Sequence, residues 1–340
     1  MALKTYGIDF GTSTIKISRK GHGIVLDERN IVAIADKKNI IATGDEAYDM
    51  YEKAPPNIVV THPVRNGVIA DVANMTALLI HFIKKISGGK RLGTADYIVA
   101  TPTNITEVER RSFYDLIASS TLKVGNIKIV EKPVADAVGA GLDIMSARGV
   151  MIVNIGADTT EISVLSLGGI VLSKLIPIGG NKFDEAIKNT VKKKHNLYIG
   201  DKTSESLKRK LASALPGVVA SVNVYGRDVV SGLPVEVEIN SKTVYESISE
   251  YLYSIIDSIR VILERTPPEI SSDIIDGGIY VTGGSANIFG LDELISEETN
   301  LNVNICEDPA NTVVKGLARI MDESGLSSLA NQLKPKTFVD

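Results

Sequence analysis

The sequence predicts an α/β protein made of two related lobes. Its 340 residues correspond to about two domains at the usual size of roughly 150 residues each. One segment occurs twice, as IDFGTSTIKIS at residues 8–18 and as VNIGADTTEIS at 153–163, and Gly-Ile-Val-Leu follows at 23–26 and 169–172. Each copy has the composition and alternation of a strand, a glycine-containing turn and a second strand. Elsewhere strands alternate with amphipathic helices, which indicates layered α/β lobes.

Three elements are expected after the first hairpin. Residues 74–86 carry apolar side chains at helical spacing and predict a helix with one buried face. Residues 98–100 predict a short buried strand. Residues 106–117 predict an amphipathic helix, with Thr106 as its N-cap and Glu109 in the capping-box position.

The next two elements form a strand–helix pair. Residues 127–131 predict a strand, and Pro133 suits the first turn of the following helix because its missing N–H is not needed there. Small residues dominate this helix and permit close packing against a neighbouring element. They are Ala135, Ala137, Gly139, Ala140 and Gly141.

The second half of the chain contains a predicted hairpin arm and a further strand. Residues 222–224 and 235–239 alternate around Ser231 and Gly232, which is typical of a hairpin. Residues 279–282 predict a strand that leads into Gly-Gly-Ser and then a helix.

The composition excludes several classes of protein. The chain is 44% hydrophobic and 23% charged, so it can bury large cores and is not disordered. A formal net charge of -4 gives no reason to expect nucleic-acid binding. The basic run from Lys192 to His195 is interpreted as a solvated helix face, with contact to an acidic partner as the alternative.

The sequence favours a cytoplasmic protein. A single cysteine, Cys306, excludes an internal disulfide and suits a reducing compartment. The N-terminal residues enter a strand pattern directly, without the features of a signal peptide. No apolar stretch approaches the roughly 20 residues of a membrane span.

The repeated hairpin has the residues of a phosphate site. A glycine at the turn, Gly11 or Gly156, lets the backbone amides approach phosphate oxygens. Asp9, at the end of a strand, can hold the water shell of Mg²⁺. Threonine hydroxyls can add hydrogen-bond donors at Thr12, Thr14, Thr159 and Thr160.

Longer motifs carry a resemblance to a known family. Asp9-Phe-Gly-Thr-Ser-Thr14 resembles the first phosphate motif of the actin, Hsp70 and sugar-kinase superfamily, and Val281-Thr-Gly-Gly-Ser-Ala286 resembles its adenosine motif. Along almost its whole length the chain resembles MreB, the bacterial actin that organises cell shape. The matching segments are Gly23-Ile-Val-Leu-Asp-Glu28, Gly44-Asp-Glu-Ala47, Asn66-Gly-Val-Ile-Ala-Asp71, Thr106-Glu-Val-Glu-Arg-Arg111, Gly139-Ala-Gly-Leu142, Gly179-Gly-Asn-Lys-Phe-Asp-Glu-Ala-Ile187 and Asp308-Pro309.

The resemblance implies a fold and a domain division. The fold is the actin-like two-lobed ATPase fold, with duplicated β-sheet subdomains around a nucleotide cleft. Domain I would comprise residues 1–140 and 310–340, with a small subdomain at about 30–60; domain II would comprise 141–309, with a small subdomain at about 183–243.

The resemblance also implies a site for ATP and Mg²⁺. Asp9 and Asn154 would hold Mg²⁺ through water. Glu205 and Lys208 match the family pair that grips the adenosine, although by spacing alone they are an ordinary i,i+3 pair. The remaining nucleotide-binding positions are Gly11, Thr12, Ser13 and Thr14, then Gly156, Ala157, Asp158 and Thr159, and finally Gly283, Gly284, Ser285 and Asn287.

Departures from the family pattern affect the second phosphate motif and the hydrolytic site. Asn154 stands where the family has aspartate, and Ala157 and Asp158 replace glycines. Lys132 replaces the glutamate that orients or activates the attacking water. A lysine ammonium has three donors and no acceptor, so it cannot accept a hydrogen bond from that water.

The catalytic candidates are therefore Lys132, Glu131 and Thr159. Losing the water-positioning group removes a factor of about 10²–10⁴ in rate, so slow ATP hydrolysis at best is expected. Lys132 could instead pair with the γ-phosphate. Glu131 alternates to the other strand face and is a poor substitute. In a rewired site, Asp158 would supply the missing carboxylate to Mg²⁺.

The predicted function is that of an ATP-binding, filament-forming bacterial cytoskeletal protein for cell shape or motility, with impaired hydrolysis. Self-association and paralogues are the expected partners, and a divergent, spiroplasma-type paralogue fits the departures. Lys90, Arg91 and Leu92 could contact an anionic membrane surface, each basic residue adding about 1 kcal/mol, or form a bare turn. Other functions are possible for the same fold. One alternative is a scaffold that holds ATP and never polymerises, and another is a small-molecule kinase of the same superfamily. An Hsp70-type chaperone would need a further substrate-binding domain.

Overall fold

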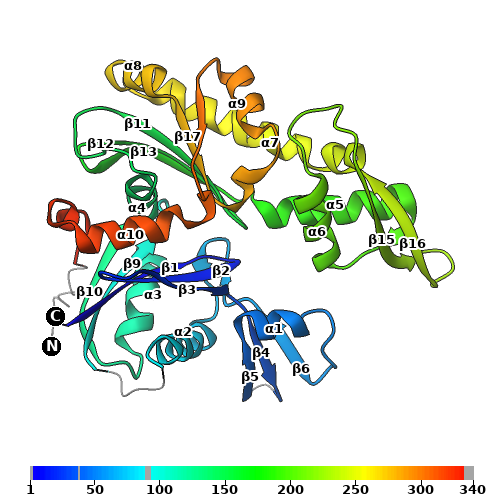
Figure 1. Cartoon of the computed structure of the whole chain (residues 1–340), viewed down its shortest axis with the longest axis horizontal. Helices are drawn as coiled ribbons and strands as arrows, with labels where there is room; N and C mark the ends of the chain where they lie inside the picture. Colours follow the sequence, from blue (N-terminus) through cyan, green and yellow to red (C-terminus); the bar gives the residue numbers. More distant parts are fainter. Residues whose placement is uncertain (1–2, 37–38, 89–92, 333–340) are drawn as a thin grey trace. The chain divides into compact units, whose positions relative to one another are not determined.

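The chain forms two compact units in the computed structural model, which describes residues 3–36, 39–88 and 93–332 (Figure 1). The first unit comprises Met1–Arg148, Leu165–Val171 and Asn311–Asp340, and the second comprises Gly149–Val164 and Leu172–Ala310. None of the helices in the described ranges combines the length and the apolarity that a membrane span needs.

The first unit is built on a five-stranded sheet of order β10-β9-β1-β2-β3. The central strand β1 runs antiparallel to β2 and parallel to β9. Its alternating residues Tyr6, Ile8 and Phe10 are all buried, as expected for the middle of a covered sheet. The strands are β1 (Lys4–Phe10), β2 (Thr14–Arg19), β3 (Gly23–Arg29), β9 (Ala95–Thr101) and β10 (Val124–Glu131).

Helices cover both faces of this sheet. Helices α2 (Val72–Ile86) and α3 (Glu107–Ala118) lie on one face, and α4 (Lys132–Gly139) and α10 (Thr312–Asp322) lie on the other (Figure 1). The capping box predicted for the second of these helices is present, because the Thr106 side chain accepts from the Glu109 amide and the Glu109 carboxylate accepts from the Thr106 amide. The helix predicted over 74–86 begins two residues earlier, where the Asp71 carboxylate caps it.

Helices α4 and α10 approach each other through glycine. A Cβ added to Gly139 would lie 1.7 Å from the Thr312 carbonyl oxygen, and one added to Gly316 would lie 1.6 Å from the Ala135 carbonyl oxygen. Real Cβ atoms essentially never come within 3.0 Å of such a neighbour, so only glycine fits at either position. The close packing predicted for the helix of small residues is therefore confirmed, and its partner is α10.

A small layer completes the first unit. Strands of order β5-β4-β6 pack with α1 around Ile31, Ala33 and Ala47. The elements are β4 (Val32–Ala35), β5 (Asn39–Thr43), α1 (Gly44–Met50) and β6 (Ile58–Thr61), followed by the short pair β7 (Val64–Arg65) and β8 (Val68–Ile69) and, near the C-terminus, η3 (Ser324–Leu329).

A second five-stranded sheet repeats the arrangement of the first. Its order is β13-β12-β11-β17-β18, with β11 parallel to β17 and β17 parallel to β18. In both sheets the strand that opens the repeated segment is central, with the hairpin strands on one side and two later strands on the other. The duplication seen in the sequence is thus a duplication of strand order. The strands are β11 (Val150–Ile155), β12 (Thr160–Ser166), β13 (Gly169–Ile176), β17 (Ile279–Thr282) and β18 (Val303–Ile305).

Helices and a small three-stranded sheet complete the second unit. The predicted hairpin arm is confirmed, with Val222 opposite Ile239 and Val224 opposite Val237. Lys192 and Lys193 are exposed on the last turn of α5, which agrees with a solvated helix face. The elements are α5 (Gly180–His195), β14 (Leu197–Tyr198), α6 (Asp201–Leu211), β15 (Ser221–Asp228), β16 (Pro234–Asn240), α7 (Ser241–Arg265), α8 (Pro268–Gly277), η1 (Gly284–Asn287), α9 (Leu291–Thr299) and η2 (Pro309–Asn311).

Candidate functional site

The first glycine turn joins β1 to β2, and one asparagine holds it through two hydrogen bonds. The Asn30 side chain is fully buried, its Nδ2 donates to the Gly11 carbonyl at 2.7 Å, and its backbone amide donates to the Ser13 carbonyl at 2.9 Å. A Cβ at Gly11 would lie 2.7 Å from the Thr14 carbonyl oxygen, so the turn requires glycine. The Arg29 guanidinium donates to the Ser13 hydroxyl at 3.2 Å, which brings a cation to the turn.

The second glycine turn joins β11 to β12 and is held by the start of α5. The Gly156 amide donates to the Thr159 carbonyl at 2.9 Å and closes the turn. The Gly180 amide donates to the Gly156 carbonyl at 2.9 Å, and the Asn181 amide donates to the Ala157 carbonyl at 2.7 Å. The first amides of α5, which need partners outside the helix, thereby fix the turn in place.

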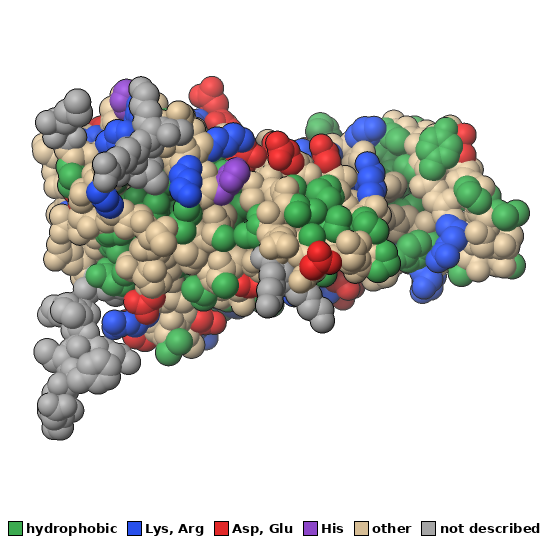
Figure 2. All heavy atoms as spheres, turned by 90° about the horizontal axis from the view of Figure 1, so that it is seen from below, with side chains coloured by type: hydrophobic (Ala, Val, Ile, Leu, Met, Phe, Trp, Pro, Cys, Tyr) green, Lys and Arg blue, Asp and Glu red, His purple; other side chains and the backbone are tan. Residues whose placement is uncertain are grey.

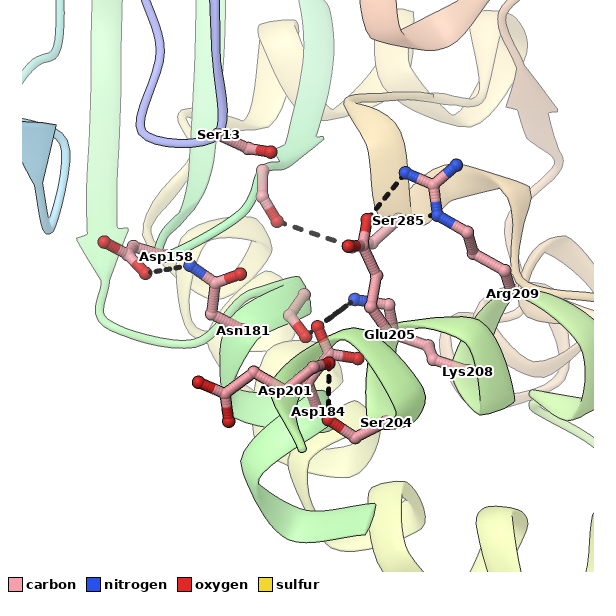
Figure 3. A network of polar contacts seen from close by, with 12 residues as sticks. Ser13, Asp158, Asn181, Asp184, Asp201, Ser204, Glu205, Lys208, Arg209 and Ser285 are labelled. Carbon is pink, nitrogen blue, oxygen red and sulfur yellow. Dashed lines mark hydrogen bonds and ion pairs between the residues drawn. The ribbon is translucent and has the colours of Figure 1, made fainter. Parts of the chain in front are cut away.

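Two polar side chains beside this turn have protein partners. Asp158 Oδ1 accepts a hydrogen bond from Asn181 Nδ2 at 2.7 Å (Figure 3). Thr160 is fully buried and its hydroxyl donates to the Ile178 carbonyl at 2.7 Å. The interpretation of Thr160 as a phosphate donor is therefore wrong, because alternation along β12 turns its side chain into the protein. Thr159, the preceding residue, is half-buried.

Glu205 and Lys208, the two residues on α6 that are expected to bind adenosine, each form an ion pair with a different residue. Lys208 Nζ lies 2.7 Å from Asp184 Oδ2 and donates to the Gly180 carbonyl at 2.9 Å. Glu205 pairs instead with Arg209 at 2.7 Å (Figure 3). Burial raises the pKa of Asp184 to about 6, against the opposing effect of the Lys208 ammonium. Asp184 lies within the matched segment Gly179–Ile187, but no role was predicted for it, since its contact with Lys208 joins two different helices.

The predicted glycine–serine segment forms the short helix η1 after β17. Ser285 is buried, and its hydroxyl donates to the Gly156 carbonyl at 3.4 Å, a long bond that places it against the second glycine turn. Asn287 is exposed and donates to the Gly284 carbonyl at 3.2 Å. Gly283, at the end of the strand, is buried. The second unit thus brings together the turn, Lys208 and Ser285.

The predicted catalytic lysine contacts the predicted magnesium-binding carboxylate. Lys132 is the first residue of α4, and its Nζ lies 2.9 Å from Asp9 Oδ1 in an ion pair. The two side chains are only 16% and 12% exposed. Asp9 Oδ1 accepts no hydrogen bond of favourable geometry within the described part of the chain, so the ion pair is its main partner. Glu131 faces Arg110 Nη2 at 3.6 Å and does not share this contact.

A second buried lysine lies beside the same carboxylate. Lys16 on β2 is directly opposite Asp9 on β1 and is 5% exposed. Its Nζ donates to Asn311 Oδ1 at 2.5 Å and lies 3.8 Å from Asp27 Oδ2. Sequence reasoning missed Lys16. The repeats did offer a sign of it, because each has a charged residue at the same mid-strand position, Lys16 in the first and Glu161 in the second.

The remaining predicted positions are less informative. Asn154 is the penultimate residue of β11, as Asp9 is of β1, and it is half-buried. Lys90, Arg91 and Leu92, the predicted membrane contact, lie outside the described residues. Among the residues that are described, no group of three or more His, Cys, Asp or Glu side chains could hold a metal ion.

Comparisons with known proteins identify the family. The family model of the MreB/Mbl protein matches residues 3–328. The chain is 40% identical over 325 residues to the cell shape-determining protein Mbl of Bacillus subtilis (strain 168), which covers 95% of this chain and 97% of Mbl. It is 32% identical to MreB5 of Spiroplasma citri, solved bound to AMPPNP and to ADP, with a TM-score of 0.90 over 96% of this chain and 98% of that one.

A more distant likeness extends the fold comparison. MamK, solved as a double helical filament, is 22% identical, with a TM-score of 0.78 over 94% of this chain and 98% of MamK, and it shares the fold alone. The predicted actin-like α/β fold and the resemblance to MreB are both confirmed by these matches. The family match covers nearly the whole chain, and the chain belongs to the MreB/Mbl family.

Proposed function

We propose that this chain is a bacterial cytoskeletal protein of the cytoplasm that binds ATP, assembles into filaments that act in cell shape or motility, and hydrolyses ATP slowly. The repeated glycine turn is the observation that carries the nucleotide proposal. Both turns follow a buried strand, and in both the glycine lies against the carbonyl oxygen of the residue three positions later. Hydrogen bonds from another part of the chain hold each turn in place. Such rigid backbone amides suit phosphate oxygens. MreB5 of Spiroplasma citri binds AMPPNP and ADP, in agreement with this proposal.

Two threonine hydroxyls are proposed to donate to the phosphates, and their removal should weaken binding. A hydrogen bond to a charged group contributes about 1.5–3 kcal/mol. The double substitution Thr12→Ala with Thr159→Ala is therefore expected to raise the Kd for ATP at least about tenfold. Isothermal titration of each single variant and of the double variant would measure this loss.

The matched control removes two hydroxyls that serve their own helices. Thr76 donates to the Val72 carbonyl on α2, and Thr299 donates to the Ile295 carbonyl on α9. The double variant Thr76→Ala with Thr299→Ala should bind ATP as the wild type does. Unaltered affinity in the Thr12 and Thr159 variant would show that the phosphate site is misplaced.

Slow hydrolysis is supported by the position of Lys132. Its ammonium has no acceptor for the hydrogen of an attacking water, and it pairs with Asp9. Glu131 faces Arg110, which holds that carboxylate in a different contact. We infer that ATP is retained rather than turned over, which favours long-lived assemblies.

Self-association is supported by family membership and by apolar side chains on the arm of β15 and β16. Val229, Val230 and Leu233, in the turn between these strands, are 49%, 85% and 63% exposed, and Figure 2 shows apolar side chains over this end of the second unit. Exposed apolar groups gathered on one element favour contact with another molecule. We propose that the arm contributes to contacts between copies of this chain.

ATP-dependent polymer should be recovered by high-speed sedimentation. Wild-type protein is expected to pellet with ATP over a range of salt concentrations, and Val230→Asp with Leu233→Asp should reduce the pelleted fraction because charged residues oppose burial. Val108→Asp changes an equally exposed valine on α3 and serves as the control. Absence of pelletable polymer in every condition would favour the ATP-locked scaffold instead.

Attachment to the membrane and to paralogues stays a prediction from the sequence. Lys90, Arg91 and Leu92 carry the membrane proposal, through electrostatic attraction of the two basic side chains to anionic lipid.

A further inference from the structure

The carboxylate expected to attract Mg²⁺ already has a cationic partner. Mg²⁺ prefers hard oxygen ligands, keeps several waters and is usually anchored by one or two carboxylates. Asp9 Oδ1 lies 2.9 Å from the ammonium of Lys132, and both side chains are largely buried. Burial strengthens the pairing because solvent screens it less. A hydrated divalent cation near Asp9 would meet a carboxylate that is already neutralised and an ammonium that repels it.

The second expected anchor also fits Mg²⁺ poorly. Asn154 occupies the position in the second repeat that Asp9 occupies in the first, and its amide carries no charge. Asp158, the rival candidate, accepts a hydrogen bond from Asn181. The donor set therefore disagrees with the divalent cation that the family resemblance implies.

Three cationic side chains lie on the elements next to the first glycine turn. Lys16 is nearly buried, directly opposite Asp9, and Lys132 contacts Asp9 from α4. Arg29 reaches the turn itself through the Ser13 hydroxyl. Lys132 thus pairs with Asp9, on the strand that leads to the glycine turn, and the Nζ of Lys16, on the strand that leads from it, lies 3.8 Å from a second carboxylate, Asp27. Lysine binds phosphate as a compact point charge, which is the role that Mg²⁺ otherwise fills.

We propose that Lys132 replaces Mg²⁺ as the counter-ion of the nucleotide phosphates, with Lys16 adding to the positive field, so that this chain binds nucleoside triphosphates without a divalent cation. The proposal rests on the nucleotide binding proposed above. The ammonium would exchange part of its contact with Asp9 for a phosphate oxygen, while Asp9 keeps it in position.

Binding of AMPPNP with and without the metal tests this inference directly. Isothermal titration would compare Mg²⁺ buffer with EDTA buffer for the wild type, Lys132→Glu, Lys132→Gln and the control Lys123→Glu. Lys123 is exposed just before β10 and carries the same charge change. The wild type and Lys123→Glu should keep the same Kd in both buffers within about threefold. Lys132→Glu places two carboxylates together, so its Kd should rise at least about tenfold in EDTA.

The glutamine variant separates charge from shape. Lys132→Gln should bind more weakly than the wild type in EDTA and recover part of the loss in Mg²⁺, and circular dichroism would confirm that each variant is folded. A wild-type affinity that falls tenfold or more in EDTA would overturn the inference, as would a Lys132→Glu variant indifferent to the metal. Absence of wild-type binding in both buffers would instead contradict the nucleotide-binding function itself.

Discussion

Replacing Lys132 with glutamate is expected to raise phosphate release from ATP by about 100-fold or more in the presence of Mg²⁺. Glutamate supplies the acceptor that an ammonium lacks, and it removes the positive charge that neutralises Asp9. Two carboxylates beside the first glycine turn would then attract the hydrated cation. Steady-state phosphate release, measured side by side for the wild type and Lys132→Glu, would give the rate ratio.

The glutamine variant is again the informative control. Lys132→Gln breaks the ion pair and supplies a neutral acceptor for the water but no carboxylate base, so its phosphate release should rise less than that of Lys132→Glu. Ordinary turnover by the wild type would mean that another group, such as Asp158 or Glu131, positions the water. An unchanged rate in Lys132→Glu would remove Lys132 as the main defect.

Adding one methyl group between α4 and α10 is expected to destabilise the protein strongly. Gly139→Ala or Gly316→Ala would place a Cβ within 1.7 Å or 1.6 Å of a backbone carbonyl oxygen on the facing helix. Neither helix can yield cheaply, because both contact β9 of the first sheet and a buried hydrogen bond joins the Thr312 hydroxyl to Asp136. We expect each variant to lose at least about 2 kcal/mol of unfolding free energy, despite the better helix propensity of alanine.

Urea unfolding followed by circular dichroism would measure this loss. Gly325→Ala, in η3 of the same unit, meets nothing within 4 Å and serves as the control. Its stability should stay within about 0.5 kcal/mol of the wild type. If Gly139→Ala and Gly316→Ala are as stable as that control, the two helices can move apart without loss of unfolding free energy.

Much of the fold follows from local patterns in the chain. The repeated segment implied two similar sheets, and the structure has two sheets of the same strand order. Thr106 and Glu109 predicted a capping box that is present. Such features can be predicted from the sequence because the residues that form the hydrogen bonds or share the buried face are only a few positions apart in the chain. The glycines of the two turns were recognisable for the same reason.

The partners of the buried charges depended on tertiary structure. Nothing near Lys132 in the chain indicates that its ammonium pairs with Asp9, nor does the motif around Lys208 indicate Asp184. Thr160 looked like its neighbour Thr159, yet strand alternation buried its hydroxyl against Ile178.

Patterns in the chain therefore predicted the family, the repeated hairpin and the positions of both glycine turns. The tertiary structure decided which charges neutralise each other and which helices require glycine at their contact. Local periodicity records what a segment buries and bonds within itself. An ion pair between Asp9 and Lys132 exists only because β1 and the start of α4 meet in space, through packing that no short stretch of sequence describes.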